Sequence, residues 1–408
     1  MRLGTLCAKA LLLVILLTMA GTGTALALDV QAPAMVTGGR IAGDETSTRV
    51  FFDIDRKVDF STFYMARPDR VVIDAPALLF RFAETDALEP RGLVTFRQYG
   101  AITRERSRIV LSLAHPARIS SMTLEEVEPG KKYRLVLDLA RIARDAFDTT
   151  LEKQRELVGA SGAVVTKGDR VRMPAPAKRE GRYTVVVDPG HGGIDSGAVG
   201  KKGTEEKILT LALARLVKEQ IAAAGPYDVL LTRDEDVFMS LRDRVAFFRR
   251  NNADLVISIH ADSLRVSQFR GASIYTLSET ASDQIAHELA ESENMADIVG
   301  GIDASPDDEE IPEILAEFTS RETDRFSLSF SSALVAELGK GIQLVRNPQR
   351  HASFAVLKAP EVPGVLLELG YLSNEEDEKL LLDPKWQKTT AGLVARAVHN
   401  FFAPRLPN

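Results

Sequence analysis

The chain has 408 residues, of which 45% are hydrophobic and 26% charged, so it is long enough for two or three packed domains. Its formal net charge of -6 at neutral pH lacks the basic surplus of a dedicated nucleic-acid-binding protein, and we expect no nucleic-acid partner. The one cysteine, Cys7, lies in the segment described next, which excludes disulfides and thiol chemistry from the rest of the chain.

The first 27 residues have the order of a secretory signal peptide. Arg2 and Lys9 precede an apolar run at 10–17, and small residues then lead to Ala-Leu-Ala at 25–27. We expect cleavage after Ala27. An uncleaved membrane anchor is the alternative, but the apolar run is short for a bilayer. No later segment is long and apolar enough, so we expect no membrane span after cleavage.

Residues 28–143 predict a small all-β sandwich domain. Short stretches of alternating apolar and polar residues, separated by proline and glycine, are typical of strands, and they lie at 49–54, 70–74, 107–113 and 133–139. The next segment, 144–181, loses this periodicity and contains two prolines near its end, which predicts a linker.

From residue 182 to about 403, apolar strands and amphipathic helices alternate. This alternation predicts an α/β domain with a mostly parallel sheet. The predicted strands lie at 183–188, 227–232, 255–260, 272–277 and 365–369. The predicted helices lie at 204–224 with Thr204 as its cap, 241–250, 283–298, 331–345 and, at the end of the chain, up to about 402.

Four side chains of this domain predict a site at one edge of the sheet. His191 follows the first strand, His260 ends the strand at 255–260, and Glu368 lies near the end of the last strand. The carboxyl ends of strands in an open α/β sheet form its ligand crevice, so these residues can converge there. Glu206 lies in the first helical turn after the glycine loop, which returns to the same edge.

Helical phase favours Glu206 over its neighbour Glu205 as an inward-facing carboxylate. Steps of three and four from Glu206 reach Leu209, Leu213, Leu216, Val217 and Ile221, which form an apolar stripe. The same steps from Glu205 reach Ile208 and Ala212 but then Arg215 and Glu219. A buried carboxylate is costly unless it is paired or binds a metal.

Two imidazoles and one carboxylate indicate a catalytic zinc site, because they leave the fourth tetrahedral position open. We predict His191, Glu206 and His260 as Zn²⁺ ligands and Glu368 as the general base that passes a proton to the leaving amine. Each residue taken singly has a structural alternative: a turn for His191, a hydrogen-bonded core group for His260. The glycine loop could also hold phosphate, but it lacks the Lys-Ser/Thr ending of a P-loop.

Four motifs, in order over about 190 residues, resemble the zinc-dependent N-acetylmuramoyl-L-alanine amidases. They are Asp-Pro-Gly-His-Gly-Gly within 185–200, Glu-Lys at 206–207, Ser-Ile-His-Ala-Asp at 258–262 and Leu-Glu-Leu-Gly-Tyr-Leu-Ser-Asn at 367–374. The resemblance implies the same three zinc ligands and the same catalytic glutamate. It also implies the substrate, peptidoglycan, cut at the amide between N-acetylmuramic acid and L-alanine.

The N-terminal part resembles the AMIN domain, a β-sandwich that targets such enzymes to peptidoglycan and the division site. Together the two parts resemble the periplasmic cell-division amidases of the AmiC type, which implies a periplasmic location at the septum. Two alternatives stay open: another zinc hydrolase, such as a peptidase, and a wall-binding protein whose metal site is vestigial.

A segment at about 291–330 exceeds what a minimal α/β hydrolase needs. It contains an acidic turn at 305–310 and a helix-like stretch at 311–323, and a solvated surface insertion is the simple interpretation. It resembles, however, the regulatory helix region of division amidases, which blocks the active site until an activator protein of the divisome, of the LytM type, binds. Glu293 is our candidate for the blocking ligand, with Glu291 second.

Overall fold

The computed structural model of the chain describes residues 32–81, 88–161, 181–301 and 313–405. The predicted signal peptide, the linker from 162 to 180 and the acidic turn at 305–310 lie outside these residues, so those features stay predictions. Within the described ranges, none of the helices has both the length and the apolar character needed to cross a membrane.

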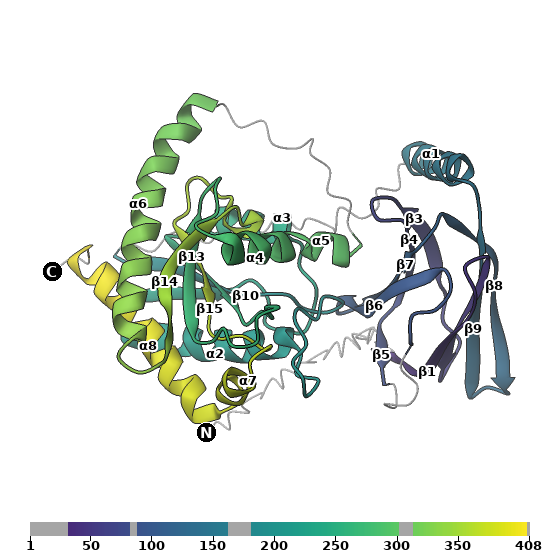
Figure 1. Cartoon of the computed structure of the whole chain (residues 1–408), viewed down its shortest axis with the longest axis horizontal. Helices are drawn as coiled ribbons and strands as arrows, with labels where there is room; N and C mark the ends of the chain where they lie inside the picture. The colour runs from purple at the N-terminus through teal and green to yellow at the C-terminus, as the bar shows by residue number, and fades with distance from the viewer. Residues whose placement is uncertain (1–31, 82–87, 162–180, 302–312, 406–408) are drawn as a thin grey trace, which may run out of the picture. The chain divides into compact units, whose positions relative to one another are not determined.

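The N-terminal part is built from strands β1 to β9 and confirms the all-β prediction (Figure 1). The strands are β1 (Ala34–Gly43), β2 (Ser47–Ile54), β3 (Ser61–Met65), β4 (Arg70–Pro76), β5 (Leu78–Phe80), β6 (Val94–Thr103), β7 (Arg106–Leu113), β8 (Ala117–Glu128) and β9 (Lys132–Arg141). They form two sheets, in the orders β5-β1-β2-β9-β8 and β3-β4-β7-β6. Alternate residues of both sheets, such as Phe52 in β2 and Ile73 in β4, share one apolar core, as in a sandwich.

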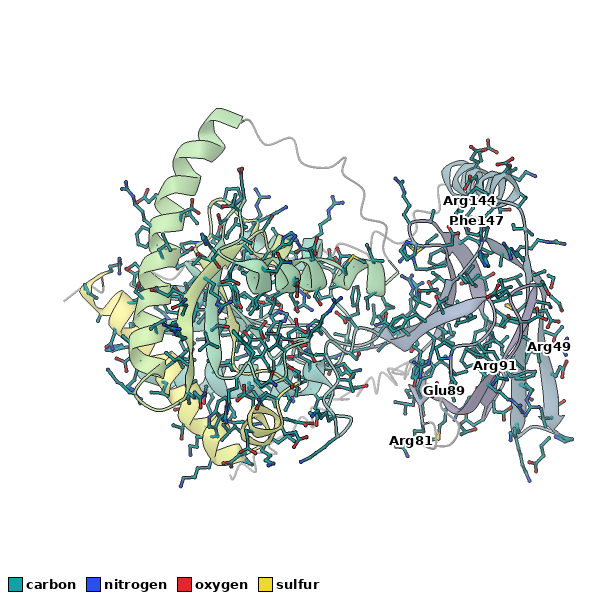
Figure 2. The ribbon with its side chains drawn as sticks, in the orientation of Figure 1. Arg49, Arg81, Glu89, Arg91, Arg144 and Phe147 are labelled. Carbon is teal, nitrogen blue, oxygen red and sulfur yellow. The ribbon has the colours of Figure 1, made fainter. Side chains whose placement is uncertain are left out.

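A helix follows the last of these strands, and here the prediction of a linker from residue 144 was wrong. Helix α1 (Arg144–Ser161) packs Phe147 edge-on against Tyr64 of β3, with ring centroids 5.9 Å apart. The Arg144 guanidinium lies over the Phe147 ring and pairs with Asp69 at 2.9 Å (Figure 2). The sequence signal was weak because Phe147 and Leu151 are the buried apolar residues among the described side chains of an otherwise polar helix.

The C-terminal part contains a six-stranded sheet that confirms the predicted α/β class. Its strands are β10 (Tyr183–Pro189), β11 (Tyr227–Leu231), β12 (Leu255–His260), β13 (Ala272–Leu277), β14 (Leu344–Ala352) and β15 (Gly364–Glu368). The order is β11-β10-β12-β15-β13-β14, and every neighbouring pair is parallel except β13 with β15. The carboxyl ends of β10, β12 and β15 therefore meet at one edge.

Helices cover both faces of this sheet (Figure 1). On one face pack α2 (Glu206–Ala224), α6 (Glu313–Leu338) and α8 (Pro384–Phe402), and on the other α3 (Leu241–Arg250) and α4 (Gln284–Asn294). The short helices are α5 (Ala296–Val299), α7 (Glu375–Leu381), η2 (Ala355–Leu357) and η3 (Ala403–Arg405). Strand residues alternate between the two cores: Val185 and Val187 face α2, whereas Val186 faces α3.

Two local predictions in this domain were wrong. The helix expected at 331–345 ends at Leu338, and the edge strand β14 follows, with Pro348 inside it. Proline lacks the N–H that a central strand needs, so β14 carries an atypical strand pattern. Thr204 does not cap α2: Glu205 holds that position without a side-chain cap bond, and the Thr204 hydroxyl donates instead to Glu378 at 2.8 Å.

Candidate metal centre

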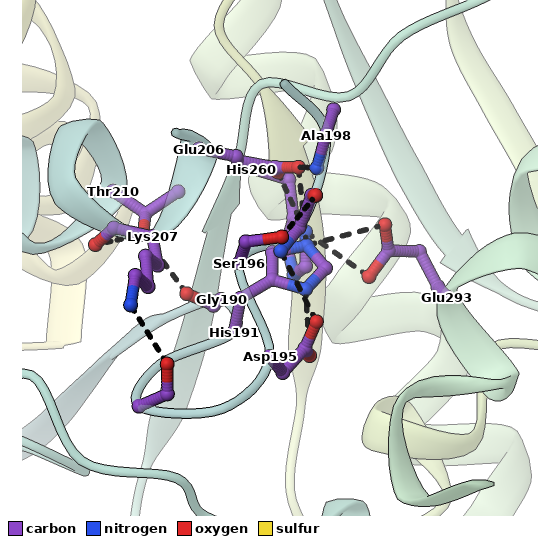
Figure 3. Close-up of polar contacts among 12 residues, drawn as sticks. Gly190, His191, Asp195, Ser196, Ala198, Glu206, Lys207, Thr210, His260 and Glu293 are labelled. Carbon is purple, nitrogen blue, oxygen red and sulfur yellow. Dashed lines mark hydrogen bonds and ion pairs between the residues drawn. The ribbon is translucent and has the colours of Figure 1, made fainter. Parts of the chain in front are cut away.

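The carboxyl edge of the sheet brings the predicted site residues together (Figure 3). His191 follows β10, His260 is the last residue of β12, and Glu206 is the first residue of α2. Glu293, near the end of α4, joins them. One ligand atom from each of these four residues lies within 4.8 Å of the others.

Glu206 is held in this cluster by backbone amides at both carboxylate oxygens. Its Oε1 accepts from the Ala261 amide at 2.8 Å, and its Oε2 accepts from the Ala198 amide at 2.9 Å. The same oxygens lie 3.3 Å from Nδ1 of His260 and 3.2 Å from Nε2 of His191. Glu206 is fully buried, which agrees with the helical phase, while Glu205 is partly exposed.

The two imidazoles turn one nitrogen each toward the carboxylates. Nε2 of His191 and Nδ1 of His260 are buried, and neither makes a hydrogen bond in the described structure. The other ring nitrogen of His191, Nδ1, lies 2.8 Å from Oδ2 of Asp195. A carboxylate at Nδ1 fixes the tautomer that leaves Nε2 free to bind a metal. Unpartnered donor atoms of this kind fit a zinc ion.

Two glycines let the backbone approach the cluster closely. A Cβ at Gly190 would lie 2.4 Å from Cε1 of His260. A Cβ at Gly197 would lie 2.7 Å from Oε2 of Glu206, and its φ of +63° also favours glycine. Larger residues at either position would push the side chains of the cluster apart.

The charges in the cluster favour a cation. Burial disfavours protonation of the imidazoles, yet Asp195, Glu206 and Glu293 outweigh it and raise the pKa of His191 well above its usual range. Burial also disfavours a charge on His260. The carboxylates of Glu293 and Glu206 outweigh this effect and raise the pKa of His260 to about 10. An environment that stabilises positive charge on two buried rings also stabilises a bound metal ion.

Glu368 ends β15 directly beside His260, its register partner on β12. Its Oε2 accepts from the Asp262 amide at 3.1 Å, whereas its Oε1 is buried with no hydrogen-bond partner in the described structure. Burial raises the pKa of Glu368 well above its usual range; His260 lowers it, and Glu206 among other carboxylates adds to the rise. A carboxyl group with a raised pKa and a free oxygen suits proton transfer.

Glu293 closes the cluster from the side of α4. Its Oε1 lies 3.6 Å from Nε2 of His191, and its side chain is about 6% exposed. The cavity beside it has a volume of about 10 Å³, room for about one water. Glu291 does not reach the site: it is exposed and lies 3.5 Å from His287 on the same helix.

Comparison with known proteins identifies the family. The model of a family described as N-acetylmuramoyl-L-alanine amidase matches residues 185–400, more than half of the chain. The chain belongs to this amidase family. The matched range of the amidase domain begins in β10 and ends in α8. It contains the four residues of the cluster, His191, Glu206, His260 and Glu293, and also Glu368.

Relatives of the amidase extend the similarity over almost the full chain. It is 32% identical over 387 residues to N-acetylmuramoyl-L-alanine amidase AmiC of Escherichia coli O6:H1, covering 92% of this chain and 91% of that protein. It is also 32% identical to AmiC of Neisseria meningitidis serogroup B, covering 93% and 92% of the two chains. AmiA of Escherichia coli K12 is 37% identical over 230 residues, 56% of this chain and 79% of that protein.

Sequence patterns did not identify the residues that surround the amidase site and hold its side chains and loops in place. Asp195, which orients His191, could have been noticed as a carboxylate four positions after the histidine. Asp262, whose amide meets Glu368, lies in the motif that contains His260. Asp188, Arg233 and Arg244 are buried polar residues, and their contacts depend on how distant segments fold together.

Proposed function

We propose that this amidase hydrolyses peptidoglycan at the amide between N-acetylmuramic acid and L-alanine, with Zn²⁺ held by His191, Glu206 and His260. The supporting observation is the pair of buried imidazole nitrogens that lack hydrogen-bond partners and face the Glu206 and Glu293 carboxylates. The donor set of two imidazoles and a carboxylate, with one further position for water or substrate, is that of catalytic zinc.

The chemistry divides between the ion and Glu368. When bound, zinc supplies a Lewis acid that lowers the pKa of water and polarises a carbonyl oxygen. Glu368 takes up a proton at its unpartnered Oε1 and delivers it to the leaving amine, while the Asp262 amide holds its Oε2 in place. Asp195 keeps the proton of His191 at Nδ1.

We further propose that Glu293 holds the enzyme in an inactive state. Its carboxylate stands where a fourth ligand or the substrate would enter, and the adjoining cavity is too small for a peptide. Hydrogen bonds hold the chain next to Glu293 on both sides of the first residue of α5. Asn294 donates to the Ser353 carbonyl at 2.8 Å and accepts from the Ala355 amide at 2.7 Å, and Asp297 accepts from the Leu241 amide at 2.8 Å. An activator of the LytM type would shift this equilibrium toward an open site.

The cellular setting completes the proposal. The similarity to AmiC proteins over 92–93% of the chain and the predicted signal peptide favour a periplasmic enzyme of septal wall splitting. In this proposal residues 1–27 are a signal peptide and 28–143 an AMIN-like targeting domain. Residues 144–181 are a connection that begins with helix α1, and 182–403 are the catalytic domain with its insertion at about 291–330.

Product analysis tests the activity. Zinc-loaded wild-type protein and the Glu293→Ala variant are incubated with purified sacculi, and the soluble products are identified by mass spectrometry. Intact stem peptides with a free L-alanine amino group, together with glycan strands lacking peptides, are expected. New carboxyl ends within the stem peptide would instead identify a peptidase.

A control variant separates catalysis from wall binding. Glu293→Ala combined with Glu368→Ala should bind sacculi and zinc but lose most of the peptide release, about 10²- to 10⁴-fold. If Glu293→Ala itself bound sacculi without releasing any product, the alternative of a wall-binding protein with a vestigial site would be favoured.

A further inference from the structure

The loop that carries His191 is held by buried cations through its carbonyl oxygens. Arg244 donates to the Pro189 carbonyl at 2.7 Å and to the His191 carbonyl at 2.6 Å. Arg233 donates to the Pro189 and Gly190 carbonyls at 3.1 and 2.8 Å. Gly193, further along the same loop, is held by a third cation: Nζ of Lys207 donates to its carbonyl at 2.7 Å.

The two arginines come from different segments that flank the loop. Arg233 lies just after β11, and Arg244 lies in the first turn of α3; each is 3% exposed. Arg244 is anchored by the buried carboxylate of Asp188, which it meets at 2.6 Å. Asp188 in turn accepts from the Ser258 hydroxyl at 2.7 Å, so the anchor belongs to the central strands.

The arrangement is electrostatically expensive for a purely structural role. Burial and, to a smaller extent, the charge of Arg244 together lower the pKa of Arg233 to about 10. Buried ion pairs can often be replaced by apolar side chains without loss of stability. Two buried guanidinium groups beside a single loop therefore indicate that the loop needs them to keep its conformation.

The loop has such a requirement at His191. Its φ of 59° lies in the left-handed region, which a residue with a Cβ rarely adopts. The fork of Arg244 holds the carbonyls on both sides of Gly190, at Pro189 and His191, in fixed directions. A residue held in a rarely populated conformation persists only when its surroundings over-determine it.

We propose that Arg244, assisted by Arg233, is a positioning residue that presets the backbone of His191 so that its Nε2 faces the metal site before the metal binds. The inference rests on the proposed zinc function, which it deepens. Neither arginine contacts the cluster atoms themselves; they act through the carbonyl groups of the loop.

Zinc affinity distinguishes positioning from stabilisation. Zn²⁺ dissociation constants are measured by chelator competition for wild type, Arg244→Met and Arg244→Lys, with apo and zinc-bound melting temperatures for each. Loss of an outer-shell contact typically weakens metal binding about 10- to 100-fold, and both variants should lie in this range. The lysine retains the charge but not the fork, so it should not rescue the affinity.

Arg182→Met is the matched control. Arg182 also donates to a carboxylate and to a carbonyl, those of Asp228 and Tyr227, but before the amino end of β10. It should lower the apo and zinc-bound melting temperatures equally and leave zinc affinity unchanged. Arg244→Met should lower the zinc-bound value more than the apo value, because weaker binding adds less stability.

The outcomes separate the two proposals. Wild-type zinc affinity in folded Arg244→Met protein would overturn the positioning role and leave the zinc function standing. Wild-type affinity in Arg244→Lys alone would show that charge rather than fork geometry acts, which also contradicts the proposal. A wild-type protein that binds no zinc would overturn the proposed function and the positioning role together.

Discussion

Oε2 of Glu293 lies 3.1 Å from Nδ1 of His260, while its other oxygen faces Nε2 of His191 at 3.6 Å. One carboxylate from α4 thus contacts both imidazoles of the cluster. Burial alone would raise the pKa of Glu293, yet His260 and His191 lower it to about 2, so the group is ionised at neutral pH. In the proposed inactive state, this ionised carboxylate would compete with a substrate oxygen.

Removing this carboxylate should activate the enzyme. Glu293→Ala removes two buried charged contacts, with His191 and His260. Close charge pairs contribute about 1.5 kcal/mol or more, so peptide release from sacculi should rise about 10- to 100-fold without a partner. Glu291→Ala is the control, because Glu291 is exposed on the same helix and should leave the rate unchanged. An unchanged rate in zinc-loaded Glu293→Ala would remove Glu293 as the inhibitory ligand.

Metal content should depend on the two imidazoles. Wild-type protein should carry about one zinc per chain by elemental analysis, because the structure offers a single set of two imidazoles and a carboxylate in its described residues. His191→Ala or His260→Ala should lose it. His287→Ala, on the exposed side of α4, should retain it. Stoichiometric zinc in both site variants would place the ion elsewhere.

Glu368 should matter for the rate and not for zinc. Glu368→Gln preserves the side-chain shape and can still accept from the Asp262 amide, but it cannot carry the proton. In the Glu293→Ala background we expect normal zinc content and a loss of activity of about 10²- to 10⁴-fold, the usual contribution of general acid–base catalysis. Full activity in this variant would exclude Glu368 from the mechanism.

The buried Asp188 should make the stability of the apo protein depend on pH. Burial opposes its charge, but Arg244 and the hydroxyls of Thr232 and Ser258 lower its pKa below the ordinary value of 3.8. Its stabilisation is therefore complete above the unfolded-state pKa and is lost as the pH falls through the lower folded-state pKa. Asp188→Asn leaves Arg244 without its anchor and should cost about 3–5 kcal/mol near pH 7.

Urea unfolding in the presence of a chelator measures this difference. The gap between wild type and Asp188→Asn should be full at pH 6–7 and shrink below about pH 4. A gap of constant size across this range would mean that Asp188 contributes by packing and not by its charge.

The N-terminal part should be dispensable for hydrolysis. Its strands enclose their own apolar core. Deletion of 28–143 should leave peptide release by the remaining chain intact and abolish septal localisation, which fluorescence microscopy of a tagged protein would show. A deletion variant that neither folds nor binds zinc would contradict the division into two domains.

The sequence predicted the α/β class and the neighbourhood of the cluster because both follow from local patterns. Strand ends in a parallel sheet share an edge, so His191, His260 and Glu368 could be assigned to one place. The three- and four-residue spacing of apolar positions after Glu206 distinguished it from Glu205.

Other features depend on tertiary contacts that no local pattern contains. The polar character of α1 and the proline in β14 hid a helix and an edge strand, respectively. The role of Arg244 becomes visible only when α3 is placed against the loop after β10. Asp195 acts through a ring nitrogen whose orientation is set by the folded loop.

The pairing of His260 with Glu368 across β12 and β15 has a consequence for how such a protein can diversify. Because side chains alternate along a strand, one residue inserted into β15 would turn Glu368 to the opposite face of the sheet. Connecting segments can change length freely, since they do not alter which strand positions are paired. Surviving insertions and deletions should therefore fall between strands, and the short spans Leu255–His260 and Gly364–Glu368 should keep their lengths among functional descendants.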